Sequence, residues 1–204
     1  EKVFINSFVL GMQNLPACVA GLEILQTTDL EDPAFAVVAN EVINFFNAMV
    51  QNIVAVRKQI SPEVFTNKLR PYFEPKVVGG KKYFAPGGAQ MPICLMDLLL
   101  WGIDCDDPSY IRYWNESVQY LPNAYRNKVG TMMGNLSITS RVTQFTATGN
   151  DIVRASVQGV LGILREMEKF RQPHLRVAKE NMKIRPERSV GSGGYDLEIL
   201  EYLL

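Results

Sequence analysis

Histidine is almost absent from this chain, since His174 is the only one in 204 residues. A zinc or non-haem iron site with two histidines, a H-E-x-x-H protease and a Cys/His zinc finger all need more imidazoles than one. A Ser-His-Asp triad would have to use His174, and the sequence contains no G-x-S-x-G segment. The histidine count therefore excludes the common metal-binding and hydrolytic motifs within this chain.

Cysteine, net charge and long apolar runs are also scarce. The 3 cysteines form no C-x-x-C pair and leave one thiol over, which is typical of a reducing compartment, so we expect a cytoplasmic protein. The 21 Lys and Arg residues balance 21 Asp and Glu residues, so no overall field attracts nucleic acid or an anionic membrane. The longest apolar stretch, Met91 to Ile103, contains Asp97 and is shorter than the roughly 20 residues that span a bilayer. We therefore expect a water-soluble protein with small-molecule partners, and neither nucleic acid nor a membrane as a partner.

The apolar residues repeat with a helical period, which predicts an all-α fold. Ser61-Pro62 and Asp107-Pro108 are typical helix starts, and Arg70-Pro71 predicts a helix end. Between the helices, residues 72–90 are rich in proline and glycine, which predicts an irregular connection with a small ribbon at 77–84. The expected helices cover residues 34–56, 62–69, 92–101, 108–121, 124–133, 153 to Pro173 and beyond, and 196–203.

The single histidine follows a proline in the segment F-R-Q-P-H-L-R, where we expect the last long helix to be interrupted or bent. A lone histidine is more often a surface or core residue than a ligand. One imidazole is nevertheless enough for a haem protein, because the porphyrin supplies four nitrogen ligands. Arg171, Arg176 and Lys179 lie within two turns of His174 and either pair with haem propionates or form a solvated basic face.

Arg70 ends the short helix five residues after Phe65. Its simplest role is to complement the negative C-terminal end of the helix dipole. The alternative is a bidentate contact with a ligand carboxylate, while Phe65 packs against an aromatic part of the same ligand. The residues themselves leave both roles open.

Two glycine-rich segments, Pro86–Ala89 and Gly191–Tyr195, do not match a P-loop or a dinucleotide-binding loop. They are either flexible turns or places where the bare backbone approaches a cofactor or substrate. Asp97 lies within an apolar helix, which predicts a buried carboxylate with a structural hydrogen-bond partner.

Five segments, in order, resemble the indoleamine 2,3-dioxygenases. They read S-P-E-V-F-T-N-K-L-R (61–70), F-A-P-G-G-A-Q (84–90) with M-D-L-L-L-W-G-I (96–103), Y-L-P-N-A-Y-R-N (120–127), R-Q-P-H-L (171–175) and G-S-G-G-Y-D-L (191–197). The family's segments are N-P-x-x-F-x-x-x-x-R, F-A-G-G-S-A-G-Q with F-D-V-L-L-G-I, Y-M-P-P-A-H-R-N, the proximal-histidine segment and G-T-G-G-T-D-L. The proline before His174 and the S-G-G-Y sequence are similar to the pyrrolnitrin-pathway branch of this family, the monodechloroaminopyrrolnitrin synthases.

The resemblance implies one helical haem-binding domain over residues 1–204, with His174 as the proximal iron ligand. The cofactor would be haem b, because the sequence has no C-x-x-C-H attachment motif. Other residues that the resemblance places near the haem are Gly88, Ala89, Arg171 and Ser192. It also implies a substrate site in which Arg70 holds a carboxylate, Phe65 contacts the ring, the backbone of Gly87, Gly88 and Ala89 lies near the amine, and Ser192 and Gly193 form a mobile loop.

The implied activity is oxygenation or ring rearrangement of tryptophan or a tryptophan-derived indole with O₂, for which the protein supplies position and a dry pocket. The alternative is a non-catalytic haem-binding or sensor protein that keeps the indole pocket. The family has a region before Glu1 that completes the distal wall, so we expect this chain to be the larger, C-terminal part of a longer one. The synthase branch has a tyrosine eight residues after its histidine, where this chain has Met182, so the rearrangement does not follow from the resemblance.

Overall fold

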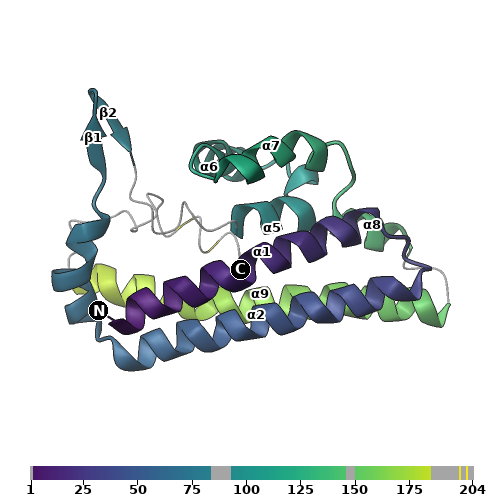
Figure 1. Ribbon diagram of the computed structural model, residues 1–204, viewed down its shortest axis with the longest axis horizontal. Helices are drawn as coiled ribbons and strands as arrows, with labels where there is room; N and C mark the ends of the chain where they lie inside the picture. Colours follow the sequence, from purple (N-terminus) through teal and green to yellow (C-terminus); the bar gives the residue numbers. More distant parts are fainter. Residues whose placement is uncertain (1, 84–92, 146–149, 185–197, 199–200, 202–204) are drawn as a thin grey trace.

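Three long helices lie side by side and form the base of the molecule (Figure 1). They are α1 (Lys2–Thr27), α2 (Pro33–Gln59) and α9 (Asp151–Ile184). In this computed structural model, the described residues are 2–83, 93–145, 150–184, 198 and 201. Helix α2 packs against both α1 and α9, running antiparallel to α1 and parallel to α9.

The shorter elements connect α2 to α9. After α2 come α3 (Pro62–Val64), the π-helical η1 (Phe65–Leu69), the 3₁₀-helical η2 (Arg70–Phe73), and a hairpin of β1 (Lys76–Val78) and β2 (Lys81–Tyr83). Beyond residue 92 follow α5 (Ile93–Leu100), η3 (Gly102–Asp104), α6 (Pro108–Val118), α7 (Asn123–Met132) and α8 (Ile138–Gln144). This mainly helical architecture confirms the predicted all-α class.

Side chains cap the helices where the sequence predicts helix starts. The Oγ of Ser61 accepts a hydrogen bond from the Val64 N–H at 3.2 Å. A carboxylate oxygen of Asp107 accepts one from the Tyr110 N–H at 2.8 Å. In both cases the next residue is a proline, whose missing N–H costs nothing in the first helical turn.

The predicted ribbon is also present, as a hairpin that stands away from the helices (Figure 1). Val77 pairs with Lys82 in antiparallel register. Gly79 and Gly80 form the turn with φ values of 58° and 78°, the left-handed conformation that a tight two-residue hairpin turn requires.

The structure differs from the predicted helix boundaries at two prolines. Helix α9 is continuous through Pro173, so the expected interruption is wrong. The proline removes one backbone donor from a helix of 34 residues, and packing against α2 supports the rest. The predicted helix end at Arg70 is wrong as well, because η2 accommodates Pro71 in its first turn and continues to Phe73.

Two helices were not predicted at all, α1 and α8. Apolar residues occur on more than one side of α1, so its sequence has no clear amphipathic stripe, and Pro16 lies inside it. Helix α8 is too short for a periodic pattern to show. The predicted helix at 196–203 lies almost entirely outside the described residues.

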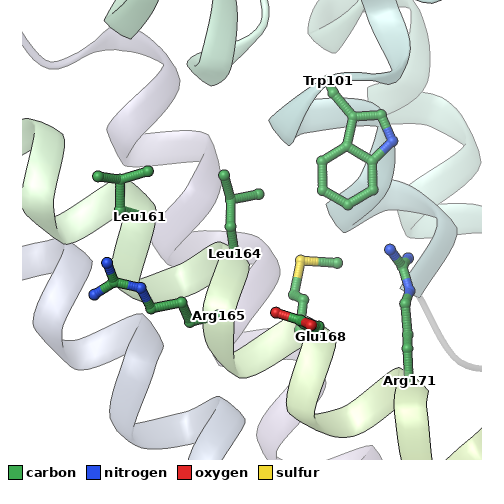
Figure 2. Close-up of a pocket in the computed structure, with 7 residues that line it drawn as sticks. Trp101, Leu161, Leu164, Arg165, Glu168 and Arg171 are labelled. Atoms are coloured by element: carbon green, nitrogen blue, oxygen red, sulfur yellow. The ribbon is translucent and has the colours of Figure 1, made fainter. Parts of the chain in front are cut away.

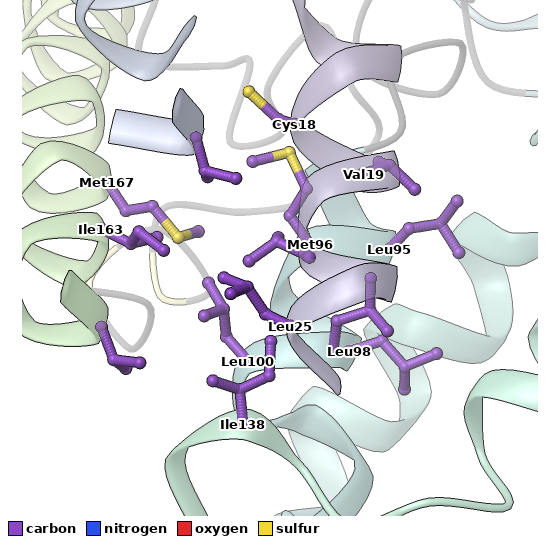
Figure 3. Packing of buried hydrophobic residues seen from close by; sticks show 14 of the residues in the cluster. Cys18, Val19, Leu25, Leu95, Met96, Leu98, Leu100, Ile138, Ile163 and Met167 are labelled. Carbon is purple, nitrogen blue, oxygen red and sulfur yellow. The ribbon is translucent and has the colours of Figure 1, made fainter. Parts of the chain in front are cut away.

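The core forms where α5 packs against the long helices. Every residue of α5 after Ile93 is buried, as expected for a helix that is apolar all round. Figure 3 shows Met96 and Leu100 converging with Ile163 and Met167 of α9 and with Ile138 of α8. Helix α5 is therefore the central element between the long helices and the α6–α8 region.

By length and composition alone, α1 and α2 are each long and apolar enough to cross a bilayer. The expectation of no spanning segment considered only unbroken apolar runs, and it therefore missed these two helices. A core helix of a water-soluble protein meets the same criterion, and the apolar windows are 35% and 33% buried within the described chain. The absence of a membrane partner stays a prediction.

Small residues allow α2 and α9 to approach closely. A methyl group built on Gly159 of α9 would lie 2.7 Å from the Cβ of Ala39, nearer than two carbons can come. At Gly162, one turn further on, the nearest atom is the flexible Cδ1 end of Ile43, at 2.5 Å.

We expect Gly159→Ala to lower the free energy of unfolding by about 1–3 kcal/mol, because the Ala39 methyl cannot rotate away. Gly162→Ala should cost less, since Ile43 can change its rotamer. Gly130→Ala is the matched control, because no atom lies within 4 Å of its Cβ position on α7. It should raise the unfolding free energy by up to about 1 kcal/mol through helix propensity. Urea denaturation measures all three, and equal effects at Gly159 and Gly130 would contradict the close approach.

Candidate functional site

His174 lies on the side of α9 that carries its buried residues. Leu175 beside it and Arg171 one turn before it are buried, and the imidazole itself is half-buried. The ring of Phe170 lies with its centroid 6.1 Å from that of the imidazole. The imidazole makes no hydrogen bond to any of the described residues.

The surroundings of His174 favour a neutral ring, although part of its surface remains accessible. Burial lowers the pKa of His174 from 6.5 to about 4, and the nearby positive charge of Arg171 acts in the same direction. An imidazole must be neutral to bind a metal, because the proton would occupy the lone pair. His174 therefore has the protonation state of an iron ligand at neutral pH.

Arg171 forms a buried ion pair with Asp97 of α5. Asp97 is 0% exposed and Arg171 is 5% exposed. Burial raises the pKa of Asp97, and the charge and hydrogen bond of Arg171 oppose that rise. The predicted structural partner of Asp97 is thus confirmed. For Arg171 a solvated basic face is wrong, and its predicted contact with a haem propionate stays a prediction.

The ring of Trp101 completes this cluster, because the Arg171 guanidinium lies 5.1 Å from the ring centroid. A guanidinium at this distance from an indole gains a cation–π attraction in addition to its ion pair. The sequence analysis did not identify Trp101 as a site residue. Its position directly after the apolar run Leu98–Leu100 and close to Asp97 could have indicated it.

Phe65 and Arg70 lie at the same end of α9 as His174. Elements α3 and η1 pack against α9, and in Figure 1 they lie beside its C-terminal, yellow-green end. Both side chains are half-buried. The ring of Phe65 contacts Phe4 of α1 at a centroid distance of 5.5 Å, and Phe4 contacts Phe73 at the same distance. Sequence reasoning missed this aromatic cluster, because nothing local links Phe4 to η1.

The remaining predicted site residues cannot be placed. Gly87, Gly88, Ala89, Ser192 and Gly193 lie outside the described residues, so their roles stay predictions.

A groove of about 310 Å³ runs along α9 on the N-terminal side of His174. Figure 2 shows Trp101 and Arg171 at one end of it and Leu161 at the other. His174 does not line the groove, and Arg171 lies between the two. The lining residues are Trp101, Leu161, Leu164, Arg165, Met167, Glu168 and Arg171.

No group of three or more His, Cys, Asp or Glu side chains that could hold a metal ion occurs within the described ranges. Those residues therefore supply no multidentate site of the zinc or non-haem iron type. A metal bound at His174 would take most of its ligands from elsewhere, as iron does in a porphyrin.

A family model for monodechloroaminopyrrolnitrin synthase PrnB matches residues 1–204, the whole chain. The chain belongs to the monodechloroaminopyrrolnitrin synthase family. This confirms the resemblance to the haem-dependent indoleamine dioxygenases, since the synthase family is part of that superfamily. It is an enzyme family of haem-dependent oxygenases that act on tryptophan-derived substrates.

The described residues of this synthase-family chain fit a haem. A neutral imidazole that makes no hydrogen bond to the described residues, on a long helix packed against the core, could bind a haem iron. His174 would hold the iron, and the aromatic and cationic residues of η1 and η2 lie at the same end of α9.

We expect His174 in the apoprotein to titrate with a midpoint near pH 4 instead of 6.5. As the only imidazole it needs no assignment, so NMR of its ring nitrogens measures the midpoint directly. The unfolded chain takes up the proton at higher pH than the folded one, so the histidine's contribution to stability is complete above pH 6.5 and is lost as the pH falls toward 4. His174→Gln is the control that removes this loss. A midpoint at 6.5 would contradict the buried environment.

Proposed function

We propose that this chain is a haem-dependent oxidoreductase that acts with O₂ on tryptophan or a tryptophan-derived indole. One observation carries the proposal: the only histidine is neutral, makes no hydrogen bond within the described chain, and lies at the end of α9 that packs against η1. The whole-chain match to an enzyme family with this chemistry supports it.

Within this proposal His174 would hold the haem iron. Haem, when bound, supplies the oxygen-binding and electron-transfer chemistry. The neutral imidazole keeps a lone pair for the iron, and the packing of α9 against α2 and α5 fixes the direction of the ring. Burial lowers the pKa of the imidazole, and the charge of Arg171 on the preceding turn adds to this effect, so the ring stays neutral.

The η1–η2 segment positions the substrate. Phe65 contacts the indole ring, and the cluster it forms with Phe4 and Phe73 excludes water from that side. Arg70 binds the substrate carboxylate, since its planar fork of N–H groups matches two carboxylate oxygens. We assign the further haem and substrate contacts to Gly87, Gly88, Ala89, Ser192 and Gly193, as the family resemblance implies.

Haem loading tests the ligand assignment. Wild-type protein reconstituted with haem b should show a Soret band at one haem per chain, because one imidazole serves one iron. His174→Ala should lose this stoichiometric loading, and added imidazole should restore it. Gln172→Ala, an exposed neighbour on the same helix, should load like wild type. Equal Soret absorbance in His174→Ala and wild type would remove His174 as the ligand.

Turnover separates the enzyme from a sensor that has the same pocket. With O₂ and reductant, the loaded protein should change its visible spectrum on addition of tryptophan, its halogenated forms or other indoles, and mass spectrometry should then show consumption of at least one. A spectral change without consumption would favour the sensor. No response to any indole would reject the substrate class.

Two ligands and one substitution test Arg70. Arg70→Leu should weaken tryptophan binding by roughly 2–5 kcal/mol if a charge-assisted bidentate pair is lost. Tryptamine has no carboxylate, so its affinity should hardly change, and haem loading should stay normal. If Arg70 only complements the helix end, the substitution should cost up to about 1 kcal/mol of stability and leave both affinities intact. Equal weakening for both ligands would indicate general damage and contradict the carboxylate contact.

A further inference from the structure

Two buried polar side chains at the site end of α9 have no hydrogen-bond partner among the described residues. They are the Oγ1 of Thr66 and the Oδ1 of Asn181, both inaccessible to solvent. The residues are 1% and 5% exposed. Buried polar atoms in native proteins are nearly always paired, so a group that belongs to neither helix is expected to satisfy these two.

Asn181 follows His174 by seven residues, which is two helical turns. Such a spacing puts both residues on the same side of α9, roughly 10 Å apart along the axis. The ion pair between Arg57 and Glu180, at 3.4 Å, joins the end of α2 to this part of α9. Since α3 begins five residues after Arg57 and also packs against α9, Asn181 lies at the end of α9 that meets the α3–η1 segment.

Thr66 lies between the two residues to which the proposed function assigns the substrate. It directly follows Phe65 in the chain and precedes Arg70 by four residues, which is about one helical turn. Thr66 and Leu69 are the buried residues of η1, and η1 packs against α9. Thr66 and Asn181 are therefore buried residues of two elements, η1 and α9, that pack against each other.

We propose that Thr66 and Asn181 form a specificity-determining contact that accepts a hydrogen bond from an N–H group of the aromatic substrate. The inference rests on the proposed function and deepens it. The Asn181 carbonyl oxygen can only accept, and the Thr66 oxygen can accept from the same group or from a neighbouring one. Both are uncharged, so they fit an N–H donor, while Arg70 takes the carboxylate and Phe65 the ring.

Two nitrogens of a tryptophan-type ligand carry such N–H groups, the ring nitrogen and the α-amine. Tryptophan, 1-methyltryptophan and indole-3-propionate distinguish them, because the second lacks the ring N–H and the third lacks the amine. Binding is measured as the Kd from the ligand-induced change in the Soret spectrum of haem-loaded protein. The melting temperature is measured on the same samples.

Thr66→Val and Asn181→Leu remove the polar atoms and keep the approximate side-chain size. Each should weaken tryptophan binding about ten-fold, because the substrate N–H then stays buried without a partner. The effect should vanish for the analogue that lacks the contacted N–H. The melting temperature should stay equal or rise, because no protein hydrogen bond is lost. Thr131→Val and Asn115→Leu, at exposed positions on α7 and α6, are the matched controls and should bind like wild type.

Equal weakening for all three ligands would overturn the inference, since it would indicate general damage to the pocket. Unchanged affinities in both variants, with wild type binding normally, would overturn it too and leave the proposed function intact. A lowered melting temperature in both Asn181→Leu and the smaller Asn181→Ala would show that Asn181 is a structural residue and would equally overturn it. A haem-loaded wild type that does not respond to tryptophan would instead reject the proposed function itself.

Discussion

The arrangement of this molecule depends on one buried ion pair, between Asp97 in α5 and Arg171 in α9. Helix α5 is apolar on all sides, so a single carboxylate within it must find a positive partner or stay protonated. Removing one partner of such a pair typically costs about 3–5 kcal/mol, because the other charge stays buried. The pair therefore fixes the rotation of α9 about its axis and its position along that axis relative to α5.

His174 takes its position from that pair. It lies three residues after Arg171, so any rotation of α9 that kept the pair from forming would also turn the imidazole away from its present side. The same guanidinium helps to keep the imidazole neutral. One arginine thus links the packing of the core, the protonation state of the candidate iron ligand and, through Trp101, the wall of the neighbouring groove.

Close approach of the long helices makes this geometry rigid. Gly159 and Ala39 let α9 lie against α2 with almost no side chain between them. At the other end of α9, the α3–η1–η2 segment, which follows α2 in the chain, meets α9 near Asn181. The path of the backbone after α2 therefore places Phe65 and Arg70 at the same end of α9 as His174.

Local chemistry in the sequence was sufficient for part of this account. Ser61-Pro62 and Asp107-Pro108 specify helix starts, the period of residues 34–56 specifies an amphipathic helix, and Gly79-Gly80 specifies a hairpin turn, because each depends on neighbours a few residues apart. The single histidine and the order of five motifs were enough to indicate the haem family. Tertiary structure alone decided that Pro173 stays within a helix, that Arg171 pairs with Asp97, and that Phe4 reaches Phe65. These features depend on contacts between residues far apart in the chain. The free energy of such contacts exceeds the local conformational preferences, and the contacts produce no periodic pattern in the sequence.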